Sequence, residues 1–295
     1  MSKIRFFIIF LILSDIVYAR PHYVTTIQPF KMIMMELVGD AGDVDCLLPP
    51  GSSPHTYELR PSDVKRVENA TAFIMGGKHL DVWAYSLNSR KRIELMHYMP
   101  ESLFLPVVGV ENHGNMVDGV DHHHGDIDPH FWTDPFVVKN IIPGLLSTLK
   151  ELDPANASIY EMNAARFDRD LDLVIAYIES LYAGTGTKPV ILSHLFFQYF
   201  LKRFDIKLID VIEKVPGKDP SPRELTQIIH KANQSGKSII LTHAQLPDRA
   251  ARIIAESIHA EIVELDPLGG TPNRLTYGEL INYNAEILAR AFKGE

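Results

Sequence analysis

The chain has 295 residues, of which 46% are hydrophobic, and its formal net charge at pH 7 is −8. An acidic chain of this kind is a poor partner for nucleic acid and is suited to attract cations. The one cysteine, Cys46, excludes an internal disulfide, and we interpret it as a small hydrophobic residue within a strand.

Residues 1–19 have the pattern of a secretory signal peptide: a short basic start, an apolar run over residues 6–13, and a small residue, Ala19, at the end. We therefore expect cleavage after Ala19 and a periplasmic protein. The alternative is an uncleaved membrane anchor, but the apolar run is shorter than the ~20 residues that a spanning helix needs. Cys46 lies too far from this site to be the lipidated first residue of a surface-anchored lipoprotein.

Strand-like and helix-like runs alternate in the first half of the chain, which indicates α/β layers. The expected strands are residues 24–27, 44–48 and 71–75, and the expected helices are residues 29–38, 62–69 and 134–152. Asp134 is placed to cap the last of these helices, and Pro143-Gly144 is expected to kink or split it. Residues 111–126 are expected to form a loop.

Residues 154–183 show helical periodicity and contain no Pro or Gly after the first residue. A helix of this length spans about 45 Å, which predicts a link between two lobes. The alternative is an ordinary surface helix with a break near Ala165.

The same alternation continues in the second half. The expected strands are residues 190–193, 207–211, 238–242 and 261–265, and the expected helices are residues 221–233, 246–258 and 277–292. The chain is long enough for two cores. We therefore predict an N-terminal lobe over residues 20–152, a linking helix over 153–186 and a C-terminal lobe over 187–295.

Four residues occupy positions where an α/β fold presents ligands: His55, His130, His194 and Asp266. Ligands of open α/β sheets bind at the carboxyl ends of the strands. His194 and Asp266 directly follow expected strands, whereas His55 and His130 lie in short loops marked by Pro. Three imidazoles and one carboxylate form a tetrahedral set that zinc accepts. Because each half supplies two ligands, we expect the metal to lie between the lobes.

Several segments of the chain resemble the metal-binding components of bacterial ABC importers. They are residues 53–63 (SPHTYELRPSD) with Gly76-Gly77, residues 128–132 (DPHFW), Ser193-His194 with Tyr199-Phe200, and residues 265–268 (LDPL). The chain is thus similar to the ZnuA/TroA-like family (cluster A-I) of zinc or manganese solute-binding proteins. The resemblance covers essentially all of the chain after residue 19.

This resemblance implies two Rossmann-like lobes joined by one long helix, with the ligand positions at His55, His130, His194 and Asp266. It also implies a monomer that delivers its ion to an inner-membrane permease driven by a cytoplasmic ATPase. In manganese binders of the family the third ligand is usually a carboxylate, whereas here it is His194, which favours Zn²⁺. The alternative is a Mn²⁺- or Fe²⁺-specific member. Neutral imidazoles are needed, so affinity should fall as the pH drops through about 6.5.

Other features of the chain vary the family pattern. The run His122, His123 and His124 resembles the His-rich loop of zinc-specific members, and we interpret it either as an auxiliary metal loop or as a solvated loop. His243 stands where the family often has an acidic residue before Pro-Gln. Because it follows an expected strand, it could face the cleft and enter the metal shell; the alternative, which we favour, is a loop histidine or a residue that supports the ligands from outside the shell. Residues 195–198 (LFFQ) replace a common Asp-Ala-Phe-Gly, which affects the packing around His194.

Two other functional classes are possible for the same residues. A secreted zinc hydrolase would use three ligands, an open water position and a base such as Glu58 or Glu213. No His-Glu-x-x-His helix supports this reading. An adhesion protein is disfavoured by the lack of a lipid-anchor cysteine. We therefore predict capture of zinc as cargo and no enzymatic activity.

Overall fold

The computed structural model describes residues 20–108, 127–214, 218–245 and 248–295. The expected signal peptide over residues 1–19 and the histidine run 122–124 lie outside the described residues. Among the described helices, none combines the length and the apolar character needed to cross a bilayer.

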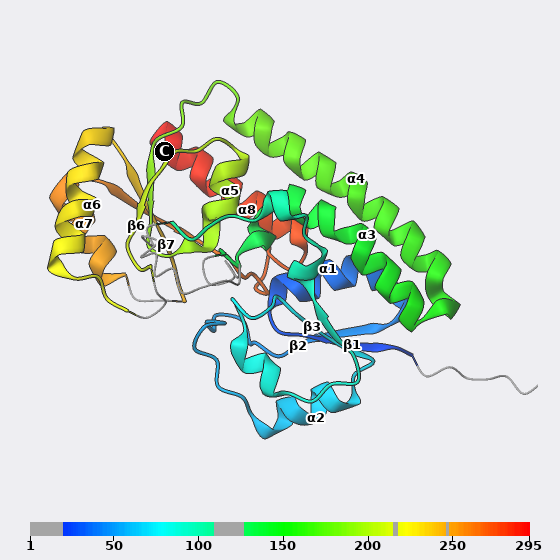
Figure 1. Cartoon of the computed structure of the whole chain (residues 1–295). Helices are drawn as coiled ribbons and strands as arrows, with labels where there is room; N and C mark the ends of the chain where they lie inside the picture. The colour runs from blue at the N-terminus through cyan, green and yellow to red at the C-terminus, as the bar shows by residue number, and fades with distance from the viewer. Residues whose placement is uncertain (1–19, 109–126, 215–217, 246–247) are drawn as a thin grey trace, which may run out of the picture.

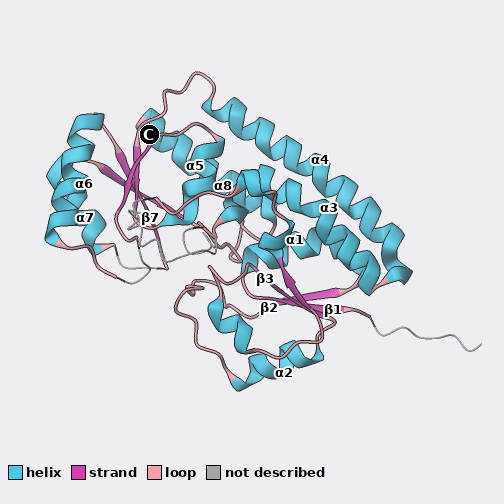
Figure 2. Cartoon of the chain, viewed as in Figure 1, coloured by secondary structure: helices cyan, strands magenta, loops and turns pink. Residues whose placement is uncertain are grey.

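Two four-stranded sheets form the framework (Figures 1 and 2). The first has the order β2-β1-β3-β4 and consists of β1 (His22–Thr25), β2 (Asp43–Cys46), β3 (Ala72–Met75) and β4 (Arg92–Glu94). The second has the order β6-β5-β7-β8 and consists of β5 (Val190–Leu192), β6 (Leu208–Val211), β7 (Ile239–His243) and β8 (Glu261–Leu265). All neighbouring strands are parallel. The predicted α/β class is confirmed. The strand β4 was not predicted.

Eight α-helices surround these sheets in the described residues. They are α1 (Gln28–Val38), α2 (Pro61–Asn69), α3 (Pro135–Leu152), α4 (Ala157–Tyr182), α5 (Gln198–Arg203), α6 (Pro222–Ser235), α7 (Arg249–Ile258) and α8 (Tyr277–Lys293). The side chain of Asp134 caps α3 as predicted, by accepting a hydrogen bond from the backbone N–H of Phe136. The six-residue α5 was not predicted, because so short an apolar segment shows no helical alternation of apolar and polar residues.

Each sheet packs on both faces. In β3, Ile74 faces a core that both lobes share, whereas Phe73 faces a separate cluster that includes α2. In β7, Leu241 faces the shared core, whereas Ile240 faces a cluster formed with α6 and α7. Figure 1 shows α2 on one outer side of the molecule and α6 with α7 on another. The inner faces of the two sheets are therefore covered by one continuous apolar core.

The long helix α4 runs without interruption over 26 residues, so the alternative of a break near Ala165 is wrong. It packs against α1 and α3 in the first half of the chain and against α8 in the second half. Figure 1 shows α3 and α4 side by side along one side of the molecule. This placement supports a link between two lobes; the lobe boundaries themselves stay a prediction.

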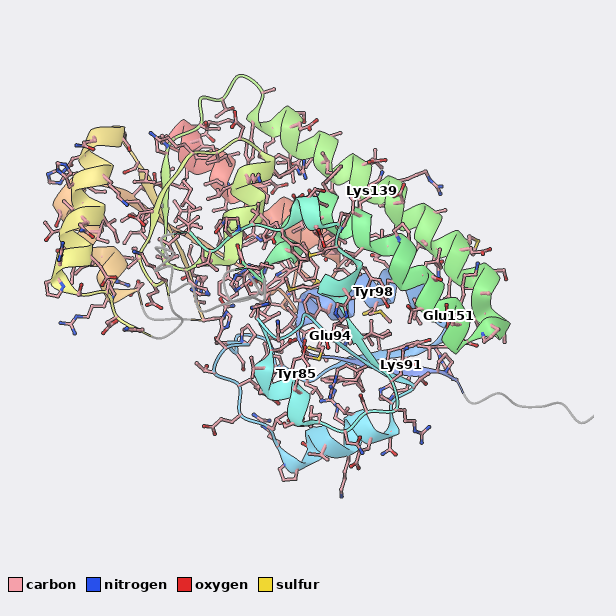
Figure 3. The ribbon with its side chains drawn as sticks, viewed as in Figure 1. Tyr85, Lys91, Glu94, Tyr98, Lys139 and Glu151 are labelled. Atoms are coloured by element: carbon pink, nitrogen blue, oxygen red, sulfur yellow. The ribbon has the colours of Figure 1, made fainter. Side chains whose placement is uncertain are left out.

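Helix α3 is also unbroken, so of the two effects expected from Pro143-Gly144 the split is wrong, whereas the kink stays a prediction. The buried face of α3, with residues such as Ile141 and Leu145, offsets the roughly 3 kcal/mol cost of an internal proline. Gly144 serves close packing: a Cβ there would lie 2.4 Å from Cδ1 of Tyr98. The hydroxyl groups of Tyr98 and Thr148 are 2.6 Å apart, and Figure 3 shows Tyr98 beside this helix.

Candidate metal centre

His55 lies on a stretch between β2 and α2 that contains neither helix nor strand. The Nε1 atom of Trp83 donates a hydrogen bond of 2.8 Å to the carbonyl oxygen of Pro54. The backbone N–H of His55 donates to Oγ of Ser53 at 3.3 Å. These contacts hold a half-buried imidazole at the end of a loop.

His130 precedes α3 and is paired with Asp128, a carboxyl that is fully buried. Oδ1 of Asp128 accepts the backbone N–H of His130 at 3.0 Å and lies 2.6 Å from the ring Nδ1. When the carboxylate accepts the Nδ1 hydrogen, Nε2 keeps its lone pair for a cation. Burial raises the pKa of Asp128 well above its usual value, so a bound cation would stabilise the ionised carboxylate and thereby this arrangement.

The segment that carries His130 is fastened to the second half of the chain. The indole Nε1 of Trp132 donates a hydrogen bond of 2.8 Å to the carbonyl oxygen of Pro267. The carbonyl oxygen of Trp132 accepts one of 2.8 Å from the hydroxyl of Tyr277. His130 therefore belongs to the first lobe in sequence but is positioned by contacts with both.

His194 follows β5 by two residues and is buried. Its Nδ1 atom lies 3.3 Å from the backbone carbonyl oxygen of Glu213. A carbonyl can only accept, so Nδ1 carries the hydrogen and Nε2 is left with a lone pair. A fixed tautomer of this kind is typical of histidines that bind a metal.

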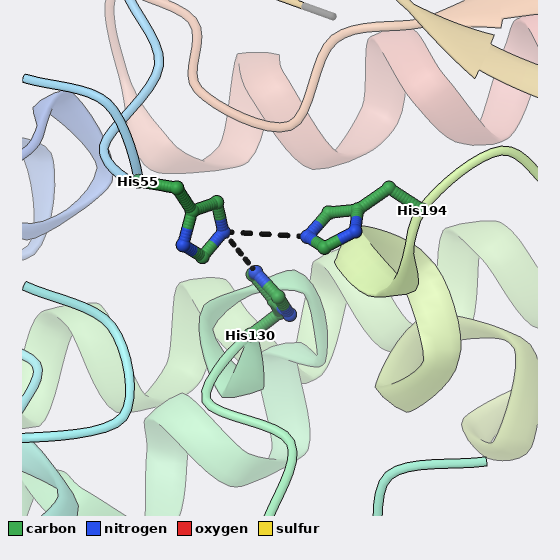
Figure 4. Close-up of side chains that lie close together, drawn as sticks. All are labelled: His55, His130 and His194. Atoms are coloured by element: carbon green, nitrogen blue, oxygen red, sulfur yellow. Dashed lines mark hydrogen bonds between the residues drawn. The ribbon is translucent and has the colours of Figure 1, made fainter. Parts of the chain in front are cut away.

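The three imidazoles converge on one point, as Figure 4 shows. Nε2 of His55 lies 3.1 Å from Nε2 of His130 and 3.3 Å from Nε2 of His194. One ring nitrogen from each of the three lies within 4.8 Å of the other two. Nitrogens bound tetrahedrally to zinc at 2.0–2.1 Å are about 3.3–3.4 Å apart. The observed spacing is therefore close to that of a zinc site.

Burial keeps these rings neutral. Desolvation, with the proximity of other histidines, lowers the pKa of His55 to about 3 and that of His130 to about 3. The same causes place the pKa of His194 well below its ordinary value. At neutral pH the site therefore offers lone pairs instead of positive charges, which is what a cation requires.

Asp266, the fourth predicted ligand, is not in this group of ring nitrogens. Its Oδ1 atom accepts the backbone N–H groups of Leu268 at 3.0 Å and Gly269 at 2.9 Å. Its Oδ2 atom lies 3.0 Å from Nε of Arg274. Both oxygens are thus engaged, and the role of Asp266 as a ligand stays a prediction.

His243, expected to support the ligands, is the last residue of β7 and is 4% exposed. Its ring centroid lies 6.1 Å from that of His194. Burial, then the neighbouring His194, lowers the pKa of His243 to about 3, against a smaller opposing effect of the Gln245 side chain. Neither ring nitrogen has a hydrogen-bond partner with acceptable geometry among the described residues.

The sequence did not single out Asp128 or Phe196 as functional residues. The Phe196 ring packs against the histidines, with centroid distances of 4.6 Å to His130, 4.9 Å to His194 and 5.8 Å to His55. The replacement of the common Asp-Ala-Phe-Gly by residues 195–198 could have drawn attention to Phe196. For Asp128 the signal was a carboxylate two residues before a candidate ligand.

Known proteins share this architecture. The family model described as "Zinc-uptake complex component A periplasmic" (ZnuA) matches residues 24–291. A protein of Thermotoga maritima described as metal-binding is 30% identical over 275 residues, which are 92% of each chain. The high-affinity zinc uptake system protein ZnuA of Bacillus subtilis is 25% identical and aligns with 90% of this chain and 86% of its own.

A solved structure shows the same fold. The solute-binding protein FpvC of Pseudomonas aeruginosa, in complex with Mn²⁺, has a TM-score of 0.80 at 23% identity and covers 94% of this chain and 99% of its own. The family model spans both sheets and all three converging histidines. The chain therefore belongs to the ZnuA family of periplasmic metal-binding components of uptake complexes.

Proposed function

We propose that this protein captures Zn²⁺ in the periplasm and delivers it to an ABC importer that consists of an inner-membrane permease and a cytoplasmic ATPase. His55, His130 and His194 replace water around the ion, which lies between the two lobes. The convergence of three lone-pair nitrogens at a zinc-like spacing carries this proposal.

Zinc is favoured over manganese by the chemistry of the donors. Imidazole nitrogen suits zinc, whereas manganese prefers carboxylate, carbonyl and water oxygens. The carboxylate predicted as the fourth ligand, Asp266, is engaged by Arg274 and two backbone N–H groups. The likeness to the Mn²⁺-bound FpvC is a likeness of fold, so it does not decide which metal this chain binds. The argument for zinc therefore depends on the types of donor atom.

Cargo is favoured over catalysis by the surroundings of the histidines. A hydrolytic zinc site needs a water position with a base beside it. Glu58 is exposed, and the backbone carbonyl of Glu213 orients His194. Among the described residues, the group of possible ligand atoms at the site consists of the three imidazoles and contains no carboxylate that could act as this base, so we propose that the protein is not an enzyme.

Metal competition followed by native mass spectrometry tests the proposal. The protein is offered equal concentrations of zinc, manganese and ferrous iron, and we expect one tightly held zinc per chain. His130→Ala should abolish this tight binding, whereas the control His97→Ala, at an exposed histidine, should not. Retention of zinc by His130→Ala would remove the site, and preferential retention of manganese would reverse the assignment of the metal.

A further inference from the structure

Three candidate ligand side chains, those of His194, His243 and Asp266, lie at the carboxyl ends of neighbouring strands of the second sheet. The strand order is β6-β5-β7-β8, so β7 lies between β5 and β8. Leu192 pairs with Leu241, and continuing this register by two residues places His194 beside His243. His243 in turn pairs with Leu265, the residue before Asp266. His243 therefore lies one strand closer to His194 than Asp266 does.

The side chain of His243 has no structural role that its polar atoms explain. It is 4% exposed, the side chain of Gln245 lies near it, and neither ring nitrogen makes a hydrogen bond of normal geometry among the described residues. Leaving one buried polar group unpaired costs about 1–3 kcal/mol. Apolar packing alone would not require an imidazole at this position. A bound cation would pair with one of the two ring nitrogens.

Asp266 is the competing fourth ligand, and its carboxylate is already used. Leu268 and Gly269 donate to one oxygen, and Arg274 pairs with the other. The guanidinium of Arg274 also lies over the ring of Tyr283, at 4.2 Å from its centroid. Coordination by Asp266 would break this ion pair, whereas coordination by His243 would disturb, among the polar contacts of the described residues, only the weak interaction of its ring with the Gln245 side chain.

The distances indicate a short movement of the His243 ring. The centroids of His55, His130 and His194 are 5.1–5.3 Å apart, and that of His243 is 6.1 Å from His194. The Phe196 ring contacts the His243 ring edge-on at 4.6 Å. The backbone of His243 is held in β7, so a rotation of its side chain along the Phe196 ring is the movement that would bring it to the three Nε2 atoms.

We propose that His243 is the fourth protein ligand of the captured cation, which completes a site of four histidines from both lobes. This inference rests on the proposed function. It assigns the open fourth position to nitrogen, so the bound ion has no carboxylate ligand. A site of four imidazoles carries no ligand charge and favours zinc over manganese more strongly than a site with Asp266.

Nuclear magnetic resonance of the whole processed protein, labelled with ¹⁵N in its histidines, tests the proposal directly. One equivalent of zinc is added, and long-range ¹H–¹⁵N spectra identify imidazoles whose nitrogen coordinates the metal. We expect four coordinated rings, and the fourth signal should be absent in His243→Gln. Three coordinated rings in the wild-type protein would overturn the proposal, and this measurement does not depend on folding of a variant.

Zinc affinity, measured by competition with a fluorescent chelator, provides the second measurement. We expect His243→Gln to weaken binding at least about tenfold. The matched control His230→Gln should stay within about twofold, because His230 is exposed on α6 and its ring is hydrogen-bonded to Gln234, away from the three converging histidines. Unchanged affinity in His243→Gln, or the tenfold loss in Asp266→Asn instead, would overturn the proposal. Failure of the wild-type protein to bind zinc would instead refute the proposed function.

Discussion

The two sheets have the same strand order, but their carboxyl edges are used differently. In the first sheet, the carboxylate of Asp81 covers the carboxyl ends of the neighbouring strands β1 and β3. This side chain accepts hydrogen bonds from Oγ1 of Thr26 at 2.6 Å, from the N–H of Gly76 at 2.9 Å and from the N–H of Gly77 at 3.0 Å. Asp81 is fully buried, and the edge is thereby sealed by the chain itself.

In the second sheet, the corresponding edge between β5 and β7 carries His194 and His243. The proposed ligands of the first lobe, His55 and His130, lie instead in the loops that precede α2 and α3. Parallel strands offer a ligand position at the carboxyl edge of each sheet. The residues at the strand ends decide how this position is used: in the first sheet the Asp81 carboxylate occupies it, whereas in the second sheet His194 and His243 leave it to the proposed ion.

Removal of the strand-end ligand in the second lobe should have the largest effect on binding. We expect His194→Ala to weaken zinc binding about a thousandfold, or on the order of 4 kcal/mol. Its Nε2 is one of the three nitrogens that converge among the described residues. Calorimetric titration measures this loss, and an affinity within tenfold of the wild type would contradict it.

Removal of the seal in the first lobe should affect stability and not binding. Asp81→Ala leaves one hydroxyl and two N–H groups unpaired in the interior, and we expect the free energy of unfolding to fall by about 3 kcal/mol. Zinc affinity of the folded protein should stay within about threefold. Urea denaturation measures the first quantity. Asp40→Ala, at an exposed carboxylate, is the control and should change stability by less than about 0.5 kcal/mol.

The support of His130 by a buried carboxylate can be tested separately. Asp128→Asn removes the charge that stabilises the Nδ1–H tautomer, and we expect zinc affinity to fall about 10–100-fold. The effect should be smaller than that of His194→Ala, because the ligand itself remains. Equal losses in the two variants would mean that Asp128→Asn disrupts the whole site, which a circular dichroism spectrum of the zinc-free variant would show.

The stability of the zinc-free protein should depend on pH below about 6.5. Histidines of the unfolded chain titrate near 6.5, whereas burial lowers the folded pKa of His55, His130 and His243 to about 3. Between these values the unfolded chain binds more protons, so stability is full above pH 6.5 and decreases as the pH falls toward 3. Urea denaturation at pH 7.5 and pH 5 should show this decrease, and a smaller one in His243→Gln.

The same pKa values revise the pH dependence expected for free imidazoles. Because the folded site stays neutral well below pH 6.5, zinc affinity of the folded protein should change little between pH 7.5 and 6. Competition with a chelator at fixed free zinc measures this. A steep fall through pH 6.5 would show that the rings are more accessible to protons than their burial indicates.

The smallest effect is expected from the His-rich segment. Deletion of residues 121–125 should leave the tight zinc site intact and remove only weak additional binding, because the three converging histidines all lie elsewhere in the chain. Native mass spectrometry at increasing zinc concentration separates the two classes. Loss of the tight ion would make the segment a primary ligand.

Periodicity predicted the regular elements well where they were long or uniformly apolar. The α4 helix and the strands that end near Met75 and Leu265 follow directly from such patterns. The short β4 and α5 were missed because three to six residues carry too little periodicity. Pro143 was misleading, since the buried face of α3 outweighs a local helix-breaking preference.

The site was predictable in part, for a related reason. His55, His130 and His194 were found from their places after strands and before a helix, and the structure brings them together. The engagement of Asp266 by Arg274 and the pairing of Asp128 with His130 depend on side-chain geometry. The packing of Phe196 against the histidines likewise depends on the tertiary structure, which a sequence pattern does not report.

The shared core and the unbroken α4 have a kinetic consequence. Wide separation of the lobes would expose apolar surface that both sheets bury, so we expect the zinc residence time to be set locally. His55 is the half-buried ligand, on a stretch without helix or strand, whereas His130 and His194 are buried. Displacement of this loop would open the coordination sphere of the proposed site. A permease that binds the His55 loop in a displaced position would therefore accelerate release of the ion without separating the lobes.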